Sequence, residues 1–133
     1  MTNWIAVERK PMGRGQFYGE QWGEVPAIAI NKSGLTLNQK FVEAFITPRK
    51  ASQVLVFISK EERKLGLKPI SDYDHEAFAL SKTGSSSYSK SRLCHCKEAG
   101  KLFPDTIGRA YRAHLDIRGA VIEIELSPQN LLK

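Results

Sequence analysis

The chain repeats one pattern of strands, tight turn and short helix, and this repetition constrains its fold more than any other feature. Residues 27–70 read as strand, turn, strand, short helix and two further strands, and residues 78–126 follow the same order. The turns match most closely, with NKSG at residues 31–34 and SKTG at residues 81–84. A repeat of this kind is typically one supersecondary unit that cannot bury its apolar face alone. We therefore expect a mostly β protein with short helices (α+β), built from two ββαββ repeats about a pseudo-twofold axis.

The length of 133 residues fits a single domain with a core of its own. Residues 1–25 precede the two repeats as an N-terminal arm of different composition. The acidic segment 71–77 joins the repeats and is too short to separate independent domains. No apolar run approaches the roughly 20 residues of a membrane span, and no export signal is visible. The sequence therefore favours a cytoplasmic protein.

Local patterns place the elements of the first repeat. Residues 27–30 and 35–37 are expected strands, and Asn38 is expected to cap a short helix that begins at Gln39. The continuous β-rich run at residues 54–58 predicts a central strand buried on both faces. Another strand is expected to follow it and to stop at Pro69.

The second repeat is more polar, and its elements are matched to the first in order. Residues 85–89 are expected to form the second strand of its hairpin, and residues 90–99 its helix, with Gly100 ending that helix. Alternating apolar residues at 109–117 and 122–126 predict an amphipathic hairpin.

The charge of the chain is unevenly distributed. The formal net charge is +6. Residues 30–70 carry +5 and residues 78–101 carry +4, whereas the linker at residues 71–77 carries −3. Because the basic bias recurs in both repeats, it favours a polyanionic partner that contacts both, and paired basic turns suit a roughly twofold partner such as duplex DNA.

No pattern of residues indicates catalysis. The CHC segment at residues 94–96 holds ligand types that bind zinc, but three adjacent residues on a helix point about 100° apart and cannot all reach one metal. Free thiols at Cys94 and Cys96 are the better interpretation. Since no nucleophile–base pair or phosphate-binding motif stands out either, we expect no metal, no cofactor and no enzyme activity.

The first repeat reads as a glycine turn at Gly34, an apolar strand, a short helix and a closing strand that ends at Pro69. In these features it resembles the AbrB/MazE-type swapped-hairpin family. The second repeat resembles the family in the order of its elements and in its turn. The first repeat departs from the family at Leu35, where members carry arginine, and in having Lys40 and Glu43 in place of a helical arginine pair. The residues that carry the resemblance are Ile30, Lys32, Gly34, Leu37, Val42, Phe45, Val54, Val56, Leu65, Leu67 and Pro69.

This resemblance implies a small barrel of intertwined hairpins that binds duplex DNA. Family units form the barrel as homodimers, so two units in one chain imply a single-chain pseudo-dimer, present as a monomer or as a homodimer of such chains. The basic residues that carry over are Lys32 and its repeat equivalent Lys82, at the turns, and Lys40 and its equivalent Lys90, at the expected helix starts.

The predicted nucleic-acid-binding set adds nearby residues to these four lysines. Arg49 and Lys50 follow the first helix, and Asn31 and Arg92 are the candidates for contacts to base edges. If the barrel forms, the basic residues are expected to share one face. The whole set is Asn31, Lys32, Lys40, Arg49, Lys50, Lys82, Lys90 and Arg92.

The aromatic N-terminal arm supports two further hypotheses. Its rings either cover an open edge of the core or form a contact surface, and residues 4–7 are expected to form a strand. As a contact surface the arm fits a protein–protein interaction module, such as an antitoxin-like or phage-type inhibitor or a subunit of a complex. Stacking on single-stranded nucleic acid is the other alternative. The four rings are Trp4, Phe17, Tyr18 and Trp22.

Overall fold

The computed structural model describes residues 20–82, 90–116 and 121–132. The elements of the first half are η1 (Glu20–Gly23), β1 (Ala27–Asn31), β2 (Gly34–Leu37), α1 (Gln39–Phe41), η2 (Val42–Ile46), β3 (Gln53–Ser59) and β4 (Lys64–Ile70). Those of the second half are β5 (Phe78–Lys82), β6 (Arg92–Cys94), α2 (Glu98–Leu102), η3 (Pro104–Thr106), β7 (Arg109–Arg112), β8 (His114–Leu115), β9 (Ile122–Glu125) and η4 (Pro128–Asn130).

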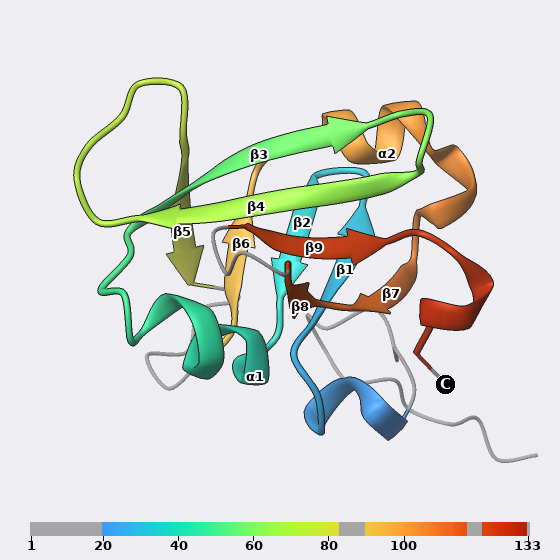
Figure 1. The fold of residues 1–133 in the computed structure, drawn as a ribbon, viewed down its shortest axis with the longest axis horizontal. Helices are drawn as coiled ribbons and strands as arrows, with labels where there is room; N and C mark the ends of the chain where they lie inside the picture. Colours follow the sequence, from blue (N-terminus) through green and yellow to red (C-terminus); the bar gives the residue numbers. More distant parts are fainter. Residues whose placement is uncertain (1–19, 83–89, 117–120, 133) are drawn as a thin grey trace, which may run out of the picture.

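The strands form one antiparallel sheet that curves into a nearly closed barrel (Figure 1). Within the described residues the sheet has nine strands in the order β7-β1-β2-β6-β5-β3-β4-β9-β8. Its two end strands, β7 and β8, are separated in the chain only by Ala113, so the sheet meets itself there. The expectation of a mostly β protein with a few short helices is confirmed.

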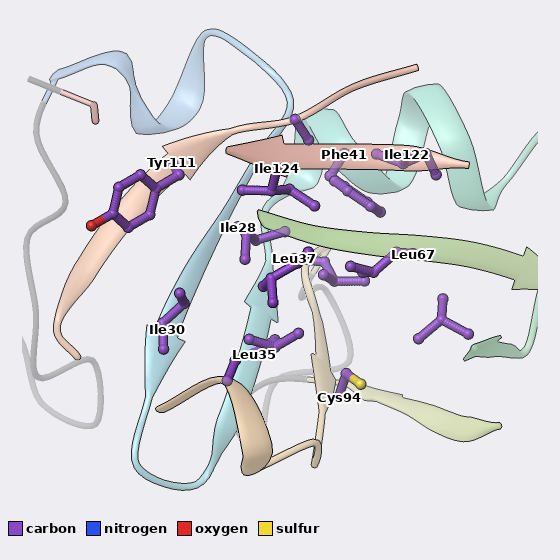
Figure 2. Close-up of a cluster of buried hydrophobic side chains, with 14 of the residues drawn as sticks. Ile28, Ile30, Leu35, Leu37, Phe41, Leu67, Cys94, Tyr111, Ile122 and Ile124 are labelled. Carbon is purple, nitrogen blue, oxygen red and sulfur yellow. The ribbon is translucent and has the colours of Figure 1, made fainter. Parts of the chain in front are cut away.

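Alternating side chains fill the interior of the barrel (Figure 2). Ile28 and Ile30 of β1 point inward, and their neighbours Ala27 and Ala29 pack on the outer face in a second cluster. Trp22 packs against that outer cluster, which agrees with the interpretation that an aromatic ring of the arm covers the core. The fully buried interior includes Ile28, Ile30, Leu35, Leu37, Phe41, Val54, Leu65, Leu67, Cys94, Ile122 and Ile124.

Asn38 caps α1, as predicted, and also ties the entry of β1 to the helix. Its side-chain oxygen accepts hydrogen bonds from the backbone N–H of Phe41 at 2.8 Å and of Ala27 at 3.0 Å. Its amide nitrogen donates to the carbonyl oxygens of Trp22 at 2.5 Å and Val25 at 2.7 Å. Since the side chain is 1% exposed, all four bonds are shielded from water.

The second half departs from the sequence prediction. The helix predicted at residues 90–99 is absent: Arg92–Cys94 forms strand β6, which pairs with both β2 and β5, and α2 begins only at Glu98. Gly100 lies inside α2 instead of ending it. Pairing on both sides of β6 outweighs the weak local helix pattern. The strands predicted at residues 4–7 and 85–89 lie outside the described residues.

Two details of the β3–β4 hairpin also differ from expectation. Pro69 does not end β4, because it sits opposite Val54 and the strand continues to Ile70. β3 is not buried on both faces, since Phe57 is 51% exposed on the outside of the barrel. A barrel strand without a covering layer buries only alternate side chains. No helix among the described residues is long and apolar enough to cross a membrane.

Candidate nucleic-acid interface

Basic residues from three separate segments meet at the end of the barrel that carries α1. Lys82 of β5 and Arg92 of β6 are direct cross-strand partners, and Arg92 also stands opposite Leu37, the last residue of β2. The loop before β3 runs beside β5, because Leu80 donates its N–H to the carbonyl oxygen of Ser52 at 3.0 Å. That loop contains residues 49–50. The predicted residues Arg49, Lys50, Lys82 and Arg92 therefore belong to one end of the barrel, and Lys90 precedes β6 there.

These cations differ in how they are paired. Lys50, Lys82 and Lys90 are exposed and make no ion pair within the described chain. Lys40 lies 3.9 Å from Glu43, a surface pair worth about 0.5 kcal/mol or less. The guanidinium of Arg49 donates to the Phe45 carbonyl oxygen at 3.2 Å. The lysines without an ion-pair partner can bind an external anion without giving up an intramolecular contact, which makes Lys40 the weakest candidate of the lysines.

Lys32 lies at the opposite end of the barrel from Lys82, and the expectation that the basic residues share one binding face stays a prediction. The β1–β2 turn packs on the chain that leads into α2, because Gly34 is in contact with the Cys94 carbonyl and the His95 backbone. In Figure 1 this turn and α2 lie at the upper end, whereas α1 lies at the lower end. The two turns precede β2 and β6, and because these strands pair antiparallel, the turns lie at opposite ends of the barrel.

The two turn tips are nevertheless close along the strands. Lys82 and Leu37 both pair with Arg92, so they lie at the same height along the strands. Lys32 lies at the height of Ser33, in the turn beyond the pair Asn31↔Gly34. From Ser33 to Leu37 the rise of about 3.3 Å per residue gives roughly 13 Å. Both tips flank the same outer surface of β1, β2, β6 and β5.

The side chain of Asn31 forms a hydrogen bond within the β1–β2 hairpin. Its side-chain nitrogen donates to the Thr36 hydroxyl at 3.1 Å, which braces the β1–β2 hairpin across its outer face. Arg92 is half-buried, and its guanidinium donates to the Ser91 carbonyl at 2.9 Å. Both residues predicted to read bases therefore have intramolecular partners.

Two basic residues near Lys32 were not predicted. Arg109 of β7 stands opposite Ile30, and Lys97 immediately precedes α2, which lies against the β1–β2 turn. Both are exposed and unpaired within the described residues. No local signal in the sequence reveals Arg109, because its position depends on the pairing of β1 with β7. The α2 end thus carries a smaller basic set of Lys32, Lys97 and Arg109.

The CHC segment does not present its three side chains together. Cys94 and Cys96 are buried, whereas His95 is exposed, as expected for an extended segment with alternating side chains. Burial raises the pKa of the Cys94 thiol to about 11, and burial also raises the pKa of Cys96. Neutral thiols at these positions act as apolar core groups.

Comparisons with family models, with curated proteins and with solved structures find no match to this chain. The resemblance to the swapped-hairpin family therefore remains a prediction.

Proposed function

We propose that the chain is a duplex-DNA-binding module that contacts phosphates from both ends of the β1–β2–β6–β5 surface. The observation that carries the proposal is the meeting of Lys82 and Arg92 with the loop at residues 49–50, where Lys50 and Lys82 have no ion-pair partner among described residues. Cations from separate segments that converge are typical of a phosphate-binding surface, although Arg49 also lies beside Asp72 and Asp74 of the linker.

Two separated basic ends suit a partner with two phosphate backbones, such as a duplex. The turn tips are roughly 13 Å apart along the strands, and the two strand spacings between β2 and β5 add roughly 10 Å across the sheet, so their separation is on the order of the major-groove width of about 12 Å or somewhat more. Each end would contact one of the two backbones that border a groove. Such contacts give affinity and orientation, and they carry no sequence information by themselves.

We further propose that the barrel is the tandem, swapped-hairpin arrangement predicted from the repeat. Exchanging β1 with β5, β2 with β6, β3 with β7–β8 and β4 with β9 leaves the set of strand pairings unchanged. The register of the paired residues supports the same exchange. It maps Leu35 onto Cys94 and Gly66 onto Glu123, so each of these two cross-strand pairs maps onto itself. An axis through both pairs relates Lys32 to Lys82, as a partner with twofold symmetry requires.

A salt-resolved binding titration tests the DNA proposal. Wild-type protein should bind a short duplex in a gel shift or anisotropy assay, and binding should weaken steeply as salt rises. The double variant Lys32→Glu/Lys82→Glu should lose binding and keep its far-UV circular dichroism and unfolding midpoint, because both side chains are exposed. Each lost phosphate contact should lower the slope of log K against log salt by roughly 1.

Lys68→Glu is the matched control. Lys68 is an exposed lysine of β4, on the side of the barrel opposite β2 and β6. Its replacement makes the same charge change as either single variant and should leave binding nearly intact. Wild-type affinity in the double variant, equal losses in the control, or stronger binding to single strands than to duplex would each refute the proposal.

The alternative function, a protein–protein interaction module, would use a different surface from the basic residues. The rings proposed as its contact surface, apart from Trp22, lie outside the described residues. A different surface favours protein contact, the exposed outer side of β3 with Phe57. A pull-down that recovers one protein and no nucleic acid would favour this alternative over DNA binding.

A further inference from the structure

One edge of β3 has no strand beside it over residues 55–59, within the part of the chain that the structure describes. β4 pairs with β3 along its whole length, whereas β5 pairs only with Gln53 and Val54. The segment before β5 is bound only at the start of β3, where Gln53 donates to the Asp74 carbonyl at 3.1 Å and accepts from the Asp74 N–H at 3.0 Å. The outward backbone groups of residues 55–59 have no hydrogen-bond partner among described residues.

This edge lacks the features that keep sheet edges from pairing. The strand reads QVLVFIS, without charge, proline or glycine. Natural proteins protect edges with lysine, proline or a bulge, and an uncharged β-rich edge is prone to pair with another strand. Val56 and Ile58 point into the core, whereas Leu55 and Phe57 face outward, with Phe57 51% exposed.

Apolar surface continues from Phe57 over the neighbouring strands. An open groove of about 350 Å³ is lined by Phe57, Gly66 and Val121, among others. A Cβ at Gly66 would lie 2.9 Å from a methyl carbon of Val121, so glycine lets Val121 rest against β4. The groove extends the apolar surface beside the open edge.

We propose that a second copy of this chain pairs with this edge, antiparallel through residues 55–59, with Phe57 at the twofold axis. Antiparallel pairing of a strand with itself is self-complementary, and Leu55 then faces Ser59 of the other copy. No charged residue opposes another in this pairing. The free length is the same on both copies, so the match needs no partner of different sequence.

The contact should be weak and concentration-dependent. A short strand pair is only marginally stable alone, and the two Phe57 rings add one apolar contact on the outer face. We expect sedimentation of wild-type protein, free of nucleic acid, to shift from monomer to dimer as concentration rises.

Two variants separate this edge from any other interface. Phe57→Lys places like charges together at the axis and should weaken dimerisation at least tenfold while leaving the core intact. Tyr73→Lys is the control, since Tyr73 is 85% exposed and lies in the linker before β5. It should leave dimerisation unchanged.

Crosslinking tests the register independently. Across a twofold axis the two β-carbons of residue 57 fall within the reach of a disulfide, so Phe57→Cys should form a covalent dimer under oxidising conditions and Tyr73→Cys should not. A wild-type chain that is monomeric at every concentration overturns the proposal. So does a dimer that persists in Phe57→Lys, or equal crosslinking in the control.

Discussion

The hairpins β1–β2 and β5–β6 hold corresponding places in the strand order, yet they differ in burial. All of β1 except Asn31 is buried, and in β2 only Thr36 is not. No residue of β5 is buried, and Cys94 is the one buried residue of β6. The difference teaches that a hairpin can take its place in the sheet without contributing much to the core. Backbone hydrogen bonds hold the second hairpin in place, although few of its side chains are buried. Its exposed positions are then free to carry charge.

The largest test of this contrast is a truncation on each side of the β2–β6 pairing. Leu35→Ala removes a side chain that is 0% exposed and should destabilise the protein by about 2–5 kcal/mol. Leu93→Ala acts on a half-buried side chain opposite Thr36 and should cost about 1 kcal/mol or less. Urea unfolding followed by tryptophan fluorescence measures both. Equal losses would show that the second hairpin contributes to the core as much as the first.

The helix starts provide the next contrast. Asn38 satisfies four backbone groups, two of them buried and two partly buried, whereas the residue before α2, Lys97, makes no capping bond with its side chain. Asn38→Ala should cost about 3 kcal/mol, since a lost cap is compounded by unsatisfied buried groups. Lys97→Ala should change stability by about 0.5 kcal/mol or less. Similar unfolding midpoints for the two variants would contradict a special role for Asn38.

The same contrast explains what could be predicted from the sequence. The first half was read correctly at β1, β2 and the Asn38 cap, because buried strands leave apolar alternation and caps leave a local signal. The helix predicted at residues 90–99 was wrong, because the pairing of Arg92–Cys94 with two distant strands decides its conformation. The four lysines matched between the two halves are exposed, and their role in binding stays a prediction. Their division between two ends, and the position of Arg109, depend on tertiary pairing that no local pattern encodes.

Charge reversals at single sites compare the two lysines predicted for β5 and α1. Lys82→Glu removes an unpaired cation beside Arg92 and should weaken duplex binding by roughly tenfold at low salt. Lys40→Glu acts on a lysine that already faces Glu43 and should weaken binding by about threefold or less. Anisotropy titrations at two salt concentrations measure both. A larger loss at Lys40 would move the interface from the β5–β6 end to the surface of α1.

The smallest expected effect concerns the end of the β2–β6 pairing at which Leu35 of the first half faces Cys94 of the second. Burial raises the pKa of the Cys94 thiol from the ordinary 9.0 to about 11. The unfolded chain therefore ionises first. The stability that the neutral thiol contributes is complete below the ordinary pKa and is lost progressively as pH rises toward the folded value. Between pH about 8 and about 10 the loss should be about 1 kcal/mol.

Cys94→Ala isolates this contribution from other groups that titrate at high pH. The variant starts from lower stability, because it shortens a buried side chain, but its unfolding midpoint in denaturant should fall less steeply over the same pH interval. Lysines and tyrosines titrate equally in both proteins, so the difference between the two slopes belongs to the thiol. Parallel slopes would mean that the thiol ionises as readily inside the barrel as in the unfolded chain. The second half would then be open to solvent even at Cys94, the one buried residue of strands β5 and β6.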